Sequence, residues 1–205
     1  MSMITFAIAA FILAITPGPG LAYVVAKTVS SGRTAGLASC IGTAIGGLVH
    51  VLAAAFGLSL VIAKSAVAFN AIKFVGAAYL VFLGIRLLMR KSEATPVGDV
   101  AAQGSRHAMI EGVVVEAMNV KTALFFLAFL PQFISPTSDM TGQLALLGSI
   151  CVALNTLVDI FAVFTAERLL VSESLRAARA RLMTRISGVT MICLGFFLAA
   201  SKRHI

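Results

Sequence analysis

Five polar side chains lie inside long apolar stretches of this sequence and are the first candidates for chemistry. They are Glu116, Asn119, Lys121, Asn155 and Asp159. The first two are spaced i, i+3 and the last two i, i+4, so each pair shares one face of a helix. Ionisable groups at membrane depth are costly and usually mark solute pathways or proton relays. A carboxylate there can bind an ammonium group or a proton, and a lysine can bind a carboxylate.

Each of these charges also has a structural alternative. Lys121 can contact a solute carboxylate, or it can pair with Glu116 or Asp159 and lock helices together. Burial favours the protonated form of a carboxyl group, and a nearby ammonium favours the carboxylate. Glu116 and Asp159 are therefore candidates for proton coupling, with a fixed ion pair as the alternative. His50 is a third candidate, although a lone histidine more often forms an interhelical hydrogen bond.

The segment TPGPG, residues 16–20, interrupts the first apolar stretch. Proline removes a backbone donor and disrupts a helix at a cost of about 3 kcal/mol, and in lipid each freed group needs a protein or water partner. A broken helix has free N–H groups on one half and free carbonyls on the other, both able to contact a solute. A packing kink is the alternative, but a kink needs only one proline. The predicted solute-binding residues are Thr16, Pro17, Gly18, Pro19, Gly20, Asn119, Lys121 and Asn155.

The composition indicates an integral membrane protein that positions these residues on helices. The chain has 205 residues, of which 60% are hydrophobic and 12% charged, and its mean hydropathy is +1.02. Soluble domains have about 25% charged residues. We predict an all-α membrane protein with six transmembrane helices, the first and fourth interrupted. The predicted helices cover about 2–26, 35–63, 66–89, 108–134, 141–169 and 185–201.

Other functional classes find little support in the sequence. It has no HExxH, GxSxG or GxxxxGK motif, so neither an enzyme nor an ATP-driven pump is indicated, and no cofactor is expected. The three cysteines lie in apolar stretches without metal-ligand or disulfide spacing, so no metal site is expected. The net charge of +8 comes largely from arginines between apolar stretches, which favours an orientation signal over nucleic-acid binding.

The distribution of basic residues predicts the orientation. They flank the first, third and fifth connections, which are therefore expected on the cytoplasmic side, with both termini in the periplasm. The turn KSA at residues 64–66 predicts an antiparallel hairpin between the second and third helices. The basic stretch 172–185 is expected to form a short interfacial helix, with a regulatory site as the alternative.

A weak internal repeat relates the two halves of the chain. GAAYLVFLGIRLLMRK in the third stretch resembles GVTMICLGFFLAASKR in the sixth. Two three-helix units have opposite orientations, which is the inverted repeat common in secondary transporters. We predict one transporter domain, 1–205, with repeats at about 1–91 and 108–205 and a linker at 92–107. The GxxxG pair Gly42 and Gly46 predicts close helix packing, within the chain or in a homodimer.

Three motifs resemble those of the lysine-exporter (LysE) superfamily, and most closely its homoserine/threonine-resistance (RhtB) type. They are ITPGPG, KFVGAAYLVFLGIRLL and NVKTALFFLAFLPQF. The resemblance implies a bacterial inner-membrane protein that exports amino acids or analogues of the homoserine, threonine, leucine and lysine class, driven by proton influx. The family pattern Asn-Pro-Lys is Asn119-Val120-Lys121 here, so a less sharply broken fourth helix is expected.

The sequence therefore predicts a secondary transporter whose solute lies between the broken first and fourth helices. Backbone N–H groups near Gly18 and Gly20, with Lys121, are expected to bind a carboxylate, while Thr16, Asn155 and Asp159 accept from an ammonium group. One alternative is a passive channel or an exporter of another solute, such as a metal cation or organic amine. A structural membrane scaffold is the other.

Overall fold

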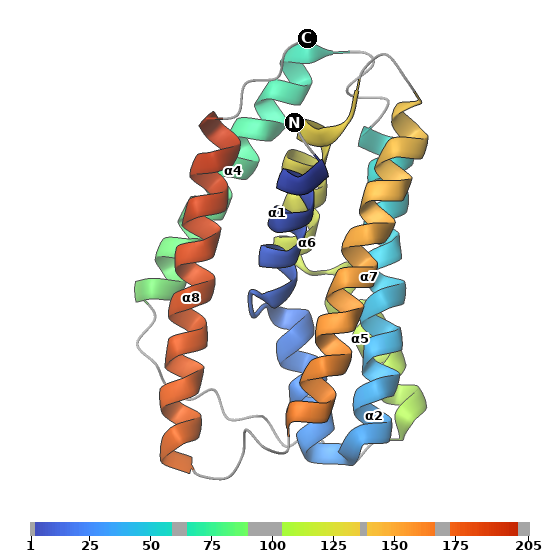
Figure 1. The fold of residues 1–205 in the computed structure, drawn as a ribbon, viewed down its shortest axis with the longest axis vertical. Helices are drawn as coiled ribbons and strands as arrows, with labels where there is room; N and C mark the ends of the chain where they lie inside the picture. Colours follow the sequence, from blue (N-terminus) through green and yellow to red (C-terminus); the bar gives the residue numbers. More distant parts are fainter. Residues whose placement is uncertain (1–2, 59–64, 90–103, 136–138, 167–172, 201–205) are drawn as a thin grey trace.

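The computed structural model describes residues 3–58, 65–89, 104–135, 139–166 and 173–200, which are mainly helical, with breaks at 16–18 and 118–119 (Figure 1). The α-helices are α1 (Met3–Ile15), α2 (Pro19–Leu52), α4 (Ala66–Met89), α5 (Ser105–Ala117), α6 (Val120–Leu124), α7 (Met140–Ala166) and α8 (Glu173–Ala200). The tighter or wider helical turns are the π-helices η1 (Ala53–Leu58) and η2 (Phe125–Phe129) and the 3-10 helix η3 (Leu130–Phe133).

Helix α2 reverses its direction at Gly32. This glycine has φ 84° and ψ 174°, and no other described residue has a positive φ. A side chain would strain that conformation, so glycine is suited to the turn. The part of α2 before Gly32 continues the line of α1, and the part after it runs back alongside (Figure 1). The turn falls between the first two predicted helices, 2–26 and 35–63.

Three helical stretches are long and apolar enough to cross a membrane: 19–58, 67–89 and 140–166. A fourth is added if α5 and the helical turns 120–133, which are bent by 43° across their break, count as one span. Helix α1 and residues 184–200 of α8 are apolar but shorter. The structure therefore supports an all-helical membrane protein with three to four clear spans.

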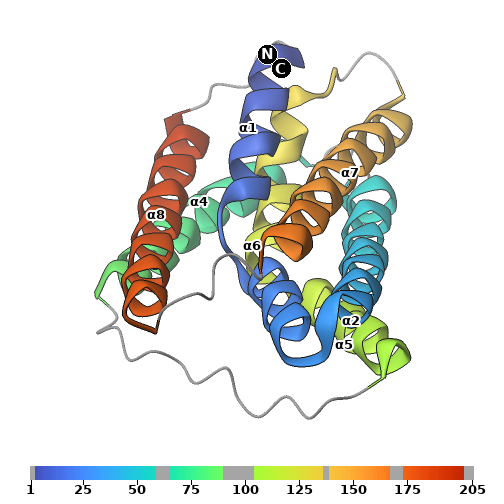
Figure 2. The same cartoon turned by 60° about the horizontal axis from the view of Figure 1, so that its bottom comes forward.

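Two local predictions were wrong. The basic stretch 172–185 does not form a separate interfacial helix, because residues 173–200 are one continuous helix, α8. The second and third helices were expected to pair as a hairpin, but among the described residues α4 packs mainly against α8 and η2, while α2 packs against α5 and α7. Figures 1 and 2 show α4 beside α8 and apart from the second half of α2.

Small residues allow these helices to approach closely. A Cβ added at Gly42 would overlap the backbone of Met109, and one at Gly112 would lie 2.9 Å from the Ser39 carbonyl oxygen. At the α4–α8 contact, a Cβ at Gly84 would lie 2.5 Å from the Gly188 carbonyl oxygen. The GxxxG stripe of α2 is therefore used within the chain, against α5.

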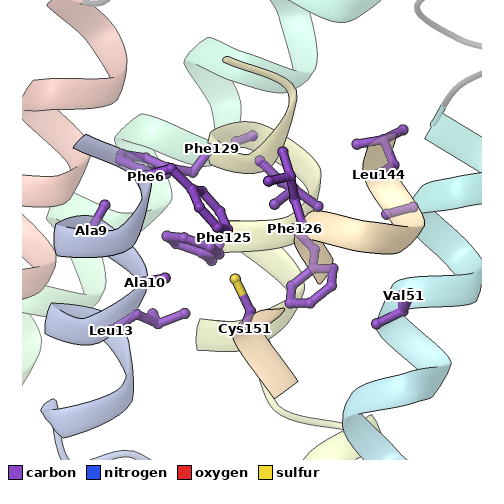
Figure 3. Packing of buried hydrophobic residues seen from close by; sticks show 14 of the residues in the cluster. Phe6, Ala9, Ala10, Leu13, Val51, Phe125, Phe126, Phe129, Leu144 and Cys151 are labelled. Carbon is purple, nitrogen blue, oxygen red and sulfur yellow. The ribbon is translucent and has the colours of Figure 1, made fainter. Parts of the chain in front are cut away.

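The apolar core lies between α1, η2, η3 and the first half of α7. Phe125 and Phe129 stack with centroids 4.8 Å apart, and Phe6 meets Phe133 edge-on at 5.4 Å. Figure 3 shows the rings of Phe6, Phe125 and Phe129 above Leu13 and Cys151, toward the end of the molecule where α1 begins. This aromatic cluster separates that end from the middle of the molecule, where both helix breaks lie.

Candidate functional site

The two helix breaks meet at the centre of the molecule, and Lys121 joins them. Its Nζ donates hydrogen bonds to the carbonyl oxygens of Leu13 (3.1 Å) and Thr16 (2.8 Å) at the end of α1. Lys121 is 7% exposed and belongs to α6, the short helix that follows the second break. A cation at the carbonyl end of a helix is favourably placed with respect to the helix dipole. The lysine of one break thus satisfies the free carbonyls of the other.

Glu116 lies against the opposite side of the first break, where α2 begins. A Cβ at Gly20 would overlap its Oε2, so only glycine leaves room for the carboxylate. Its two oxygens accept hydrogen bonds from Asn119 Nδ2 (2.9 Å) and Thr122 Oγ1 (2.6 Å). A carboxylate beside a helix N-terminus is again the favourable arrangement. The first break therefore has a cation at the carbonyl end of α1 and a carboxylate at the amide end of α2.

Asn119 and His50 support the second break. The Asn119 side-chain oxygen accepts from the backbone N–H of Lys121 at 3.1 Å and caps α6. His50 Nε2 donates to the Glu116 carbonyl oxygen at 2.9 Å, at the end of α5. His50 thus forms an interhelical hydrogen bond at the break, and it is not among the residues that line the cavity described below.

Asp159 of α7 lies on the opposite wall, facing the breaks. It is 6% exposed, and its Oδ2 lies 3.0 Å from Thr43 Oγ1. Thr43 Oγ1 is also 3.0 Å from the Cys40 carbonyl oxygen. The hydroxyl has one hydrogen. If Thr43 donates it to Cys40, a protonated Asp159 can donate to Thr43, and if Thr43 donates to Asp159 the carboxylate is accommodated. The geometry therefore suits both protonation states of Asp159.

A small cavity lies between these groups, bounded by α1, α2, α5, α6 and α7. Its volume is about 20 Å³, which accommodates a single water molecule. Its polar walls include Thr43, Glu116, Asn119, Lys121, Asn155 and Asp159. A solute as large as an amino acid requires the helices to move apart.

The structure brings five of the eleven predicted site residues to this cavity, and neither His50 nor residues 16–20 are among those that line it. Glu116, Asn119, Lys121, Asn155 and Asp159 all line it. The TPGPG segment contributes its backbone: Thr16 accepts from Lys121, and the backbone at Gly18 and Gly20 packs against Lys121 and Glu116. The carbonyl oxygen of Pro17 instead accepts from Ser187 of α8 at 2.8 Å, and Pro19 is exposed at the first position of α2.

Three threonines at the cavity were not predicted as site residues. Thr43 lies next to Gly42 in the GxxxG segment of α2, and Thr122 and Thr156 lie in α6 and α7. Hydroxyls in apolar helices commonly bond to their own backbone, so their type alone gives little signal. The spacing of Thr122 from Asn119, i, i+3, is the clue that sequence offered.

A second charged cluster, missed by the sequence analysis, lies toward the Gly32 end. Lys27, whose side chain is 0% exposed, pairs with Glu111 Oε2 at 2.9 Å, and the Tyr23 hydroxyl donates to the same oxygen at 2.9 Å. His107 Nε2 lies 3.0 Å from Glu111 Oε1. The i, i+4 spacings of Tyr23 with Lys27 and of His107 with Glu111 were the available signals. Lys27 had been interpreted only as part of a basic flank.

The sequence profile of LysE type translocators matches residues 11–202. The chain belongs to this family. This LysE type translocator is therefore a membrane transporter and not an enzyme, and the resemblance noted in the sequence is confirmed.

Several curated relatives of this translocator cover most of its length. An uncharacterized membrane protein of Vibrio cholerae is 29% identical over 202 residues, 97% of each chain. A homoserine/homoserine lactone efflux protein of Salmonella typhi is 29% identical over 148 residues, 72% of this chain and 71% of the relative. A leucine efflux protein of Enterobacter is 31% identical over 142 residues, 67% of this chain and 66% of the relative. No solved structure gives a significant match.

Proposed function

We propose that this translocator exports amino acids or close analogues across the bacterial inner membrane, in exchange for protons, through the cavity between its two broken helices. The efflux proteins among its relatives support the solute class. The observation that carries the proposal is Asp159, a carboxyl group 6% exposed that faces a cavity and has one hydroxyl beside it. Such a group needs a cation or a proton.

The coupling follows from competition for this one carboxyl group. A solute ammonium and a proton both neutralise Asp159, and both together would leave an excess charge in the cavity. A cytoplasmic solute displaces the proton, and a periplasmic proton displaces the solute after the cavity opens outward. Thr43 assists both states because its hydroxyl can donate to the carboxylate or accept from the protonated group. Glu116, which two side chains hold in place, is the second proton-coupling candidate.

We further propose six membrane crossings arranged as two inverted repeats. In this arrangement α1 and the part of α2 before Gly32 form the first crossing, and α5 with α6 forms the fourth. The half-helices that precede the breaks, α1 and α5, have 13 residues each. Helix α5 packs on α2, α1 packs correspondingly on α7, and α4 packs on α8. The positive-inside rule then places both termini in the periplasm.

Proteoliposomes test the proposed exchange. With labelled leucine, threonine, homoserine or lysine outside the vesicles, acid-loaded vesicles should accumulate at least one of them as protons leave, whereas vesicles without a proton gradient should not. Asp159→Asn should abolish the gradient-driven part, because the amide binds no proton. The matched control is Asp139→Asn, which removes an exposed acid outside the cavity. A passive channel would instead equilibrate solute without a gradient, and that result would contradict the proposal.

Two native cysteines allow a second test, of alternating access. Cys40 packs with Val24 and Val163 on the Gly32 side of the cavity. Cys151 belongs to the apolar core on the other side. Both are buried, whereas Cys193 is exposed and is replaced by serine in the test protein. A transporter that opens one side at a time should change the maleimide labelling of Cys40 and Cys151 in opposite directions when solute is added. A pore open at both sides would change both in the same direction.

A further inference from the structure

The walls of the cavity differ in what they offer to the two charged ends of an amino acid. The ionisable groups that line it are two carboxyls, Glu116 and Asp159, and one ammonium, Lys121. Two of the three hydrogens of the Lys121 ammonium are engaged by protein, because it donates to the Leu13 and Thr16 carbonyl oxygens. The Gly18 backbone covers it as well, since a Cβ there would lie 3.0 Å from Nζ.

The other donors of the cavity are also engaged. The Asn119 amide and the Thr122 hydroxyl donate to Glu116, and the Thr156 hydroxyl donates to the Val152 carbonyl oxygen at 2.8 Å. The Thr43 hydroxyl donates to Asp159 or to the Cys40 carbonyl oxygen. Among the side chains described at this cavity, the Asn155 amide is the donor to which no hydrogen bond is assigned.

Among the side chains of the cavity, these contacts leave more free acceptors than free donors. A solute ammonium would meet the Asp159 carboxylate and the oxygen lone pairs of Thr43 and Asn155. A solute carboxylate would meet two carboxyl groups, one amide and an ammonium that already serves two backbone carbonyls, which is a less favourable environment than the one a solute ammonium meets.

We propose that the cavity recognises the primary ammonium group of its solute and does not require a free carboxylate. Amides and other neutral derivatives of the carboxyl group are then solutes of the same class as the free amino acids, whereas derivatives that lack the ammonium are excluded. This inference rests on the proposed function, because it concerns the same cavity. It differs from the sequence-based expectation, in which Lys121 and the backbone near Gly18 and Gly20 bind a carboxylate.

Binding to the purified full-length protein in detergent tests the inference. The probes are L-leucine, L-leucinamide, N-acetyl-L-leucine and 4-methylpentanoate, with the corresponding threonine series, and the readout is the ligand-dependent rise of the unfolding midpoint. We expect the amino acid and its amide to bind within about threefold of each other, and the acetylated and deaminated compounds to bind at least tenfold more weakly. Asp159→Asn should weaken the amino acid and the amide equally, and Asp139→Asn should weaken neither.

A second variant separates the roles of the charges. Lys121→Gln should leave the ratio of amino-acid to amide affinity unchanged, since the lysine is engaged by backbone carbonyls. A selective loss of amino-acid binding in this variant would overturn the inference. So would wild-type protein that binds the amino acid at least tenfold more tightly than the amide, although the proposed export of amino acids would then stand. If neither the amino acids nor their amides bind, the inference and the proposed function both fail.

Discussion

The two helix breaks meet at one cavity, yet they are built in different ways. The first, between α1 and α2, has Pro17, Gly18 and Pro19 and contributes backbone groups to the site. The second, between α5 and α6, has no proline and contributes the charged side chains Glu116 and Lys121. Each break satisfies the polar groups of the other, so neither arrangement is complete alone.

The difference shows two ways to stop a helix within a membrane. Proline stops the first because it removes a donor and clashes with the preceding turn. In the second, Asn119 takes an extended conformation, with φ −74° and ψ 102°, and its side chain caps the next helix. The two halves are still bent by 43°. The missing family proline therefore does not remove the break, because a capping side chain also stabilises it.

Removing the Lys121 charge should produce the largest loss of stability. Lys121→Met leaves the carbonyl ends at Leu13 and Thr16 without their donor and leaves two buried carboxyl groups without a nearby cation. We expect the free energy of unfolding to fall by about 3 kcal/mol, measured by denaturant unfolding in detergent. Arg86→Gln, which removes an exposed basic residue on α4, is the control and should change stability by less than about 0.5 kcal/mol. A loss no larger than that of the control would mean that the two breaks do not depend on each other.

Gly20→Ala tests the same dependence from the first break. The added Cβ would overlap Glu116 Oε2 and force the carboxylate away from Asn119 and Thr122. We expect a destabilisation of about 1–3 kcal/mol, from the same unfolding measurement. Gly57→Ala is the matched control, because nothing lies within 4 Å of a Cβ there. If Gly20→Ala is as well tolerated as Gly57→Ala, the contact between Glu116 and the start of α2 is not tight.

Asn119→Ala tests the cap that replaces proline in the second break. The change removes a hydrogen bond to the Lys121 backbone N–H and another to Glu116. We expect a loss of about 1–2 kcal/mol, and a Glu116 carboxylate that is held by Thr122 alone. Asn70→Ala on the exposed side of α4 serves as the control. Equal stabilities of the two variants would show that the second break needs neither proline nor a cap.

The sequence predicted the components of the site better than their connections. The apolar surroundings of Glu116, Asn119, Lys121 and Asp159 identified them, because burial of ionisable groups is costly whatever the fold. The partner of Lys121 could not be chosen from spacing, since the carbonyl oxygens of Leu13 and Thr16 lie far away in sequence and compete with two carboxylates. Backbone groups leave no signature in residue type.

For the fold as well, the sequence predicted the positions of helices better than the contacts between them. The long apolar stretches located α4 and α7 closely, because length and hydropathy decide membrane-spanning helices. The continuity of α8 through its basic half and the packing of α4 on α8 were missed. Both depend on which helices pair, and small-residue positions such as Gly84 and Gly188 suit many partners.

Val120→Pro should have the smallest effect and restores the family pattern in the second break. Val120 is the first residue of α6, where proline is favoured because its N–H would have no partner within the helix and its φ is already helical. Its side chain is 44% exposed, so little packing is lost. We expect a gain of about 0.4–1 kcal/mol, because proline restricts the unfolded chain. The control, Val114→Pro in the interior of α5, should cost about 3 kcal/mol or more. A loss at Val120 would mean that the Asn119 cap and a proline cannot coexist, and that this chain uses the cap instead of the proline.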